Sequence, residues 1–122
     1  MALRYVLDEN LRGPFWLAMQ RECAAATPPV DVTRVGDPPD LPLATTDPDL
    51  LIWAEREGRV VVTLDEQTMP AHHADHLAGG RHSCGLFILR KRQPWAALIQ
   101  TLLRLAATTD PAAVQDVVRF IP

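Results

Sequence analysis

The feature of this sequence that most restricts its fold is a pair of short apolar runs, each of which stops at a carboxylate. Residues 3–7 read Leu-Arg-Tyr-Val-Leu and lead into Asp8, and residues 59–64 read Arg-Val-Val-Val-Thr-Leu and lead into Asp65. Apolar runs of this length are typical of strands that are buried on both faces, as in parallel sheets covered by helices. We therefore expect Asp8 and Asp65 to emerge at one edge of such a sheet.

Helix and strand patterns alternate along the rest of the chain. Apolar residues at helical spacing predict helices over 14–26, 69–78 and 95–106, and a further helix that opens at Asp47-Pro48-Asp49, with Asp47 as its N-cap, and closes at Gly58. The remaining strands are expected at 30–35, 85–89 and 117–121. This alternation predicts right-handed crossovers and an α/β fold, a three-layer α/β/α sandwich around a mostly parallel sheet.

Size and composition place the chain among globular proteins. Its 122 residues suit a single domain spanning 1–122, and 48% apolar with 22% charged residues argues against a disordered or coiled-coil chain. No apolar run reaches the roughly 20 residues of a membrane-spanning helix, and the start of the chain does not resemble a signal peptide. We therefore expect a cytoplasmic protein with no membrane partner. The cysteines, Cys23 and Cys84, match no metal or redox spacing and are expected to be free thiols.

The candidate chemistry lies in three acids, Asp8, Asp47 and Asp65, that can project over the same edge of the sheet. Converging carboxylates repel each other, and a hard divalent cation, Mg²⁺ or Mn²⁺, relieves that repulsion. Such a site suits phosphodiester hydrolysis. The same repulsion predicts that Asp65→Asn stabilises the metal-free protein. Each acid has an alternative interpretation as an ordinary turn or helix-cap residue.

Several segments together resemble one protein family. They are residues 7–11 (Leu-Asp-Glu-Asn-Leu), Asp47 with Leu50 and Ala54, and residues 57–65 (Glu-Gly-Arg-Val-Val-Val-Thr-Leu-Asp). These residues resemble the PIN-like nuclease superfamily, and more narrowly its compact bacterial branch, which is related to the toxins of VapBC-type toxin–antitoxin pairs. The similarity covers nearly the whole chain.

The resemblance implies a parallel α/β/α sandwich that cleaves RNA with Mg²⁺ or Mn²⁺. It assigns Asp8, Asp47 and Asp65 as catalytic and metal-binding acids, with Glu9 and Asn10 supporting them through hydrogen bonds. It also implies RNA and a cognate antitoxin protein as partners. We also expect that the chain can form a homodimer.

Two departures from the family pattern leave an alternative open. Many relatives carry a second acid two residues beyond the position of Asp65, where this chain has Gln67, and a glutamate after the first helix, where the local candidates are Asp37 and Asp40. The alternative is a catalytically weak or inactive PIN-like interaction module. A receiver-like phosphoacceptor is disfavoured, because Lys91 has no matching threonine.

Arg90, Lys91 and Arg92 are the densest basic residues and follow the fourth expected strand. From there they can reach RNA phosphates at the same edge as the acids, although an ordinary solvated loop explains them equally well. The net charge of −3 does not by itself indicate a nucleic-acid-binding protein.

Four histidines, His72, His73, His76 and His82, form a second cluster. His72 and His76 share a helical face, but the sequence lacks a standard zinc spacing. A histidine can also contact phosphate or carry a proton. Solvent-exposed helix positions are the simplest expectation for this cluster.

Overall fold

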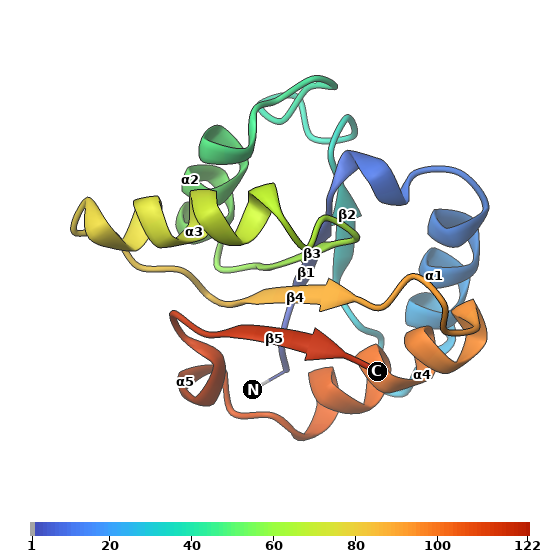
Figure 1. Ribbon diagram of the computed structural model, residues 1–122. Coiled ribbons are helices and arrows are strands. Elements are labelled where there is room, and N and C mark those ends of the chain that lie inside the picture. The colour runs from blue at the N-terminus through green and yellow to red at the C-terminus, as the bar shows by residue number, and fades with distance from the viewer. Residues whose placement is uncertain (1) are drawn as a thin grey trace.

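Five short strands form one sheet in the computed structural model, which describes residues 2–122 (Figure 1). All neighbouring strands are parallel, and their order across the sheet is β2-β1-β3-β4-β5. The strands are β1 (Tyr5–Leu7), β2 (Val32–Arg34), β3 (Val60–Thr63), β4 (Leu86–Leu89) and β5 (Val118–Ile121). Each one falls within the segment that the sequence pattern predicts.

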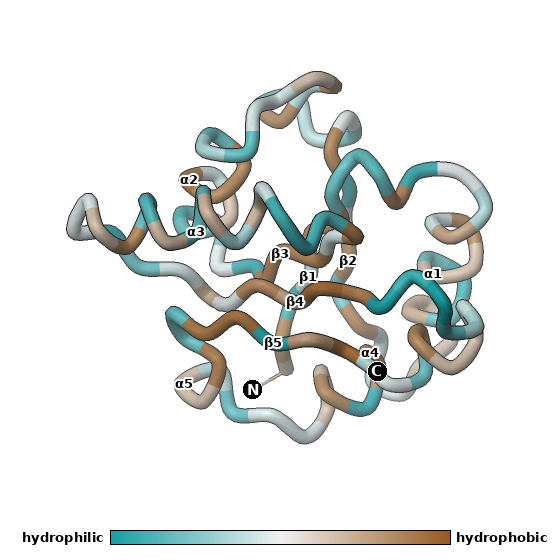
Figure 2. Tube along the Cα trace, in the orientation of Figure 1, coloured by the Kyte–Doolittle hydropathy of each residue, from teal (hydrophilic) through white to brown (hydrophobic). Residues whose placement is uncertain are grey.

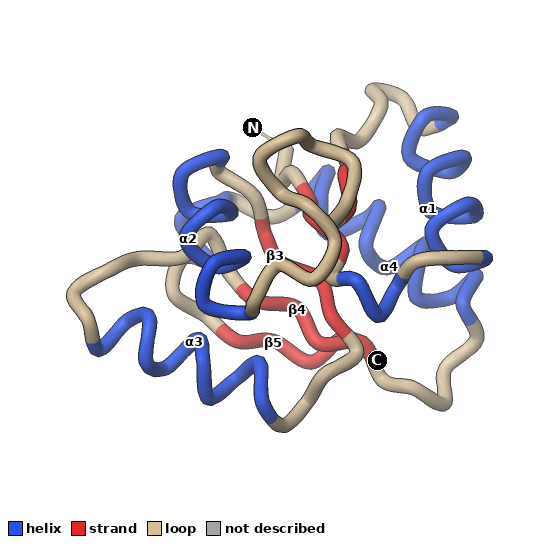
Figure 3. The backbone as a smooth tube through the Cα atoms, turned by 90° about the horizontal axis from the view of Figure 1, so that it is seen from above, coloured by secondary structure: helices blue, strands red, loops and turns tan. Residues whose placement is uncertain are grey.

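Helices cover both faces of this sheet. They are α1 (Pro14–Ala25), α2 (Asp47–Glu57), α3 (Thr68–Ala78), α4 (Trp95–Thr108), the short α5 (Pro111–Val114) and the 3-10 helix η1 (Glu9–Leu11). Figure 3 shows α1 and α4 on one side of the sheet and α2 and α3 on the other. The predicted three-layer α/β/α architecture is therefore confirmed. The single turns η1 and α5 were not predicted, because they are too short to show helical periodicity.

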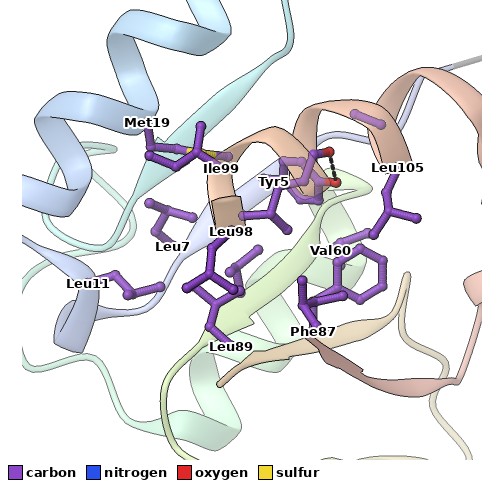
Figure 4. Packing of buried hydrophobic residues seen from close by; sticks show 14 of the residues in the cluster. Tyr5, Leu7, Leu11, Met19, Val60, Phe87, Leu89, Leu98, Ile99 and Leu105 are labelled. Carbon is purple, nitrogen blue, oxygen red and sulfur yellow. Dashed lines mark hydrogen bonds between the residues drawn. The ribbon is translucent and has the colours of Figure 1, made fainter. Parts of the chain in front are cut away.

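The apolar runs of the central strands serve two cores. Alternate side chains of a strand point to opposite faces, so Tyr5 and Leu7 pack under α1 and α4 while Val6 packs under α2 and α3. Figure 4 shows the larger core, in which the rings of Tyr5 and Phe87 lie 6.0 Å apart and the Tyr5 hydroxyl donates to the backbone oxygen of Leu102 at 2.7 Å. Hydrophobic residues are accordingly concentrated in the central strands in Figure 2.

The connection from β4 to β5 departs from the expected handedness. The chain moves in the same direction across the sheet from β2 to β3, from β3 to β4 and from β4 to β5. However, α2 and α3 lie on one face and α4 on the other, since α4 belongs to the core of α1. The β4–α4–β5 crossover therefore has the opposite hand to the two before it. The expectation of uniformly right-handed crossovers is wrong for this connection.

Two smaller findings concern residues 2–122. No helix in this range is long and apolar enough to cross a membrane. Cys23 is buried, Cys84 is partly buried, and both are free thiols, as expected.

Candidate active site

Adjacent strands bring the first carboxylate next to the end of β3. β1 and β3 are in register, with Leu7 opposite Val62, and the backbone N–H of Asp8 donates to the Val62 oxygen at 2.9 Å. Asp8 thus continues the strand pairing by one residue before the chain turns into η1. The end of β3 supplies Thr63 and Asp65 at the same edge of the sheet.

Asp8 is a half-buried carboxylate with no basic partner. Its Oδ1 accepts the N–H of Glu9 at 2.7 Å, which makes Asp8 the N-cap of η1, and its Oδ2 accepts the hydroxyl of Thr63 at 2.8 Å. Burial raises the pKa of Asp8, and the negative charges of Asp47 and Asp65 raise it further. The two hydrogen bonds lower the pKa, but they do not offset this rise. The three predicted acids are therefore close enough for each charge to act on Asp8.

Thr63 organises this edge, a role that the sequence did not reveal. The residue is fully buried, and its hydroxyl accepts hydrogen bonds from Asn10 Nδ2 at 3.1 Å and from the Asp65 N–H at 3.0 Å while donating to Asp8. Asn10 Oδ1 also accepts the N–H of Leu64 at 3.3 Å. Asn10 therefore ties the loop after β1 to the loop after β3. A threonine that ends a valine run gives no signal beyond β propensity.

Asp65 is held by the first turn of α3. Its Oδ1 accepts the N–H groups of Gln67 at 2.9 Å and Thr68 at 2.8 Å, and the Thr68 hydroxyl donates to Oδ2. Burial alone raises the pKa of Asp65, but these hydrogen bonds outweigh it and hold the pKa below its usual range. Because the charged carboxylate accepts N–H groups at the start of α3, where the helix dipole favours negative charge, we now expect Asp65→Asn to destabilise the protein, the reverse of the sequence-based expectation.

Asp47 was predicted as the N-cap of α2, and that prediction is wrong by one residue. The cap is Thr46, whose side chain accepts the N–H of Asp49 at 3.4 Å, and Asp47 is the first residue inside the helix. The Asp47 carboxylate is therefore free of the capping role. Its Oδ2 lies 3.1 Å from His72 Nδ1 instead, which connects α3 to the acidic edge.

Glu9 supports a loop rather than the other acids. Its Oε1 accepts the N–H of Ala44 at 2.7 Å, and Ala44 has a φ of 66°, in the left-handed region. Glu9 thus anchors the proline-rich loop 36–46 beside the site. Within that loop, Asp37 pairs with Arg34 at 2.9 Å and Asp40 pairs with an arginine of α2, so both carboxylates are engaged in salt bridges.

The basic residues after β4 divide between two surroundings. Lys91 lines an open hollow of about 470 Å³ together with Asn10 and Asp65. The guanidinium of Arg90 instead lies over the ring of Phe120, 5.1 Å from its centre. Arg92 is exposed. Of these three residues, Lys91 is therefore the one that shares a hollow with an acid of this edge.

Two of the clustered histidines are buried, so the expectation of solvent-exposed positions is wrong for them. His73 Nε2 lies 2.7 Å from the Ser83 hydroxyl, and burial lowers the pKa of His73. His76 Nε2 lies 2.8 Å from the backbone oxygen of His82 and 3.0 Å from Glu55 Oε1. These partners satisfy the histidines individually and account for their burial.

The carboxylates fit a divalent cation in chemical type but do not form a preassembled cage. Within residues 2–122, no group of three or more His, Cys, Asp or Glu side chains is arranged to hold one metal ion. Asp65 Oδ1 accepts an N–H group of α3, and Asp47 Oδ2 lies beside His72. Asp8 Oδ2, by contrast, accepts the Thr63 hydroxyl and contacts neither a basic side chain nor a backbone N–H group of a helix. Mg²⁺ needs only one or two protein carboxylates and keeps several waters, so Asp8 with its polar neighbours suits a hydrated Mg²⁺ or Mn²⁺ rather than zinc.

Comparison with protein-family models, with curated proteins and with solved structures gives no match to this chain.

Proposed function

We propose that this chain is a PIN-like nuclease that hydrolyses RNA phosphodiester bonds with Mg²⁺ or Mn²⁺, and that Asp8 is its central carboxylate. The observation that carries the proposal is the state of Asp8. It is an acid whose pKa is raised by burial and by two neighbouring carboxylates, and none of its hydrogen-bond partners is cationic. A divalent cation stabilises such a group, because it offsets both the lost hydration and the repulsion.

The surrounding residues support this function through position and charge. A bound cation would neutralise charge on the scissile phosphate and acidify a water. Thr63 and Asn10 fix the orientation of Asp8 and connect it to the end of β3. Lys91, on the wall of the adjacent hollow, would bind a phosphate of the RNA strand. Asp47 and Asp65 would add negative charge that attracts the cation.

The proposed activity is tested by cleavage of single-stranded RNA in Mg²⁺, in Mn²⁺ and in EDTA. We expect cleavage only with metal, and a loss of about 100-fold or more in Asp8→Asn, because removing even an outer-shell group of a metal site commonly costs 10- to 100-fold. Asp75→Asn is the matched control, since Asp75 is an exposed acid of α3 away from this edge. Cleavage that persists in EDTA, or that is equal in Asp8→Asn and the wild type, would refute the proposal.

A second candidate is a PIN-like interaction module without catalysis. Two observations favour it: Gln67 replaces the second acid of the family pattern, and no three-ligand group is assembled within residues 2–122. A toxin function would add an antitoxin that covers the open hollow beside Asp65. The absence of both RNA cleavage and metal binding would favour the module over the nuclease.

A further inference from the structure

The last strand leaves one of its faces uncovered. Val118 and Phe120 pair in register with Leu86 and Ile88 of β4, which are fully buried on the side of α2 and α3. Val118 and Phe120 themselves are 38% and 41% exposed. The cause is the reversed crossover, because α4 packs on the opposite face and brings no cover to this side of β5.

The backbone groups of Val118 and Phe120 lie on the free edge of the sheet. The N–H of Leu86 donates to the Val117 oxygen at 2.9 Å, and the N–H of Arg90 donates to the Ile121 oxygen at 3.3 Å. Backbone groups alternate along a strand, so those of Val118 and Phe120 point away from β4. β5 is one of the two edge strands of the sheet, as Figure 1 shows, and its open side presents unpaired N–H and C=O groups.

Positive charge lies on both sides of this edge. Arg119 is exposed on the face opposite Val118 and Phe120, since its partner in register is Phe87 of the α1 and α4 core. The Arg90 guanidinium covers the Phe120 ring on the other face. The strand therefore combines apolar side chains, unpaired backbone groups and cationic flanks.

We propose that the β5 edge binds an extended acidic segment of another protein, which joins the sheet as a sixth strand. Backbone pairing would provide affinity, and alternate side chains would provide specificity. Partner residues opposite Val118 and Phe120 would be apolar, and the residue between them, opposite Arg119, would be acidic. The site is independent of Asp8 and of the proposed nuclease activity.

A second copy of this chain is the main competing occupant, and the register of β5 disfavours it. A two-fold axis that sets Val118 opposite Phe120 also sets Arg119 opposite itself, where like charges repel. A shift that sets Phe120 opposite its own copy places Val118 against Pro122, which has no N–H to donate. The other shift places Phe120 against Asp116, whose φ of 63° takes it out of the strand.

The proposal is tested by isothermal titration of the full chain with short synthetic peptides. The main probe alternates valine and glutamate, one control replaces each glutamate by lysine, and another carries N-methyl groups on alternate amides, which block strand pairing. We expect the glutamate peptide to bind at least about tenfold more tightly than either control, with slower hydrogen exchange at Val118 and Phe120. Equal binding of all three peptides, or no binding of the glutamate peptide, would overturn the proposal.

Substitutions on β5 separate this surface from general effects. Val118→Pro removes an outward N–H without touching the pairing with β4, and Phe120→Asp removes the apolar contact; both should abolish binding while the protein stays folded by thermal melting. Leu17→Asp, at a side chain that is 64% exposed on α1, is the matched control and should bind normally. Arg119→Glu should reverse the preference towards the lysine peptide. A dimer that Phe120→Asp converts to a monomer would instead assign the edge to a second copy, and Phe120-dependent binding of oligouridylate would assign it to RNA.

Discussion

Thr63→Val tests how the acidic edge is held together. The substitution replaces a hydroxyl by a methyl group of similar size at a fully buried position, so the packing changes little. It removes the donor to Asp8 Oδ2 and the acceptor of the Asn10 amide and the Asp65 N–H. Any loss of stability therefore reports on these three hydrogen bonds.

The magnitude follows from the partners. A hydrogen bond to a charged group contributes roughly 1.5–3 kcal/mol and a neutral one roughly 0.5–1.5 kcal/mol. Asp8 and Asn10 are partly exposed and can bind water instead, so we expect a net loss of about 2–3 kcal/mol in the free energy of unfolding. For a domain of this size that corresponds to roughly 6–15 °C in the melting midpoint. The pKa of Asp8 should also rise further, because the Thr63 bond lowers it.

The assay is urea unfolding of the wild type, Thr63→Val and the matched control Thr33→Val. Thr33 lies in β2, partly buried, and its hydroxyl has no hydrogen-bond partner within residues 2–122, so its replacement should change stability by less than about 0.5 kcal/mol. If Thr63→Val is no more destabilising than Thr33→Val, Thr63 does not organise the site.

Four further outcomes are expected. The pKa of Asp8 is raised, so its ionisation lowers the stability of the fold as pH rises through and above the ordinary value of 3.8. Asp8→Asn should therefore gain stability relative to the wild type from pH 3 towards neutrality, and urea unfolding across this range checks this. The pKa of Asp65 is lowered, so its contribution is present above 3.8 and lost in acid, and Asp65→Asn should show the opposite trend. Glu9→Ala should speed amide hydrogen exchange in the loop 36–46 with little change elsewhere, and uniform acceleration would argue against an anchoring role. The pKa of His82 is raised by its hydrogen bond to a carboxylate, so that bond should weaken as pH rises above 6.5, seen as faster exchange in the loop after α3; His82→Gln should remove this pH dependence.

The strands and long helices could be predicted because their sequence patterns record burial directly. Val60 to Val62 are apolar in succession because helices cover both faces of β3. The apolar residues of α4 recur at helical spacing because only one face of that helix packs against the sheet. The handedness of the β4–α4–β5 crossover could not be predicted, since the amphipathic stripe of a helix does not specify which face of the sheet it covers.

The sequence pattern could bring Asp8 and Asp65 to one edge of the sheet, because they follow neighbouring strands, but it could not show what each carboxylate contacts. A carboxylate after a strand can bind the next helix through one oxygen or through both, and only the geometry shows that Asp8 contacts η1 through Oδ1 alone whereas Asp65 contacts α3 through both oxygens. The cap of α2 is Thr46, and the sequence could not place it because threonine and aspartate, which stand side by side at 46 and 47, are both favoured N-cap residues. His73 and His76 are buried because they contact the Ser83 hydroxyl and the His82 backbone oxygen, both in the segment after α3. The residue pattern of α3 itself does not indicate these partners.

The central claim is that Asp8 marks a divalent-cation site, and the melting midpoint during a Mn²⁺ titration tests it most directly. A ligand present at about 100 times its Kd stabilises the folded state by roughly 2.7 kcal/mol, or roughly 8 °C or more for a domain of this size. The midpoint of the wild type and of the Asp75→Asn control should rise by this amount, and that of Asp8→Asn should not. No rise in the wild type, or an equal rise in Asp8→Asn, would contradict the claim.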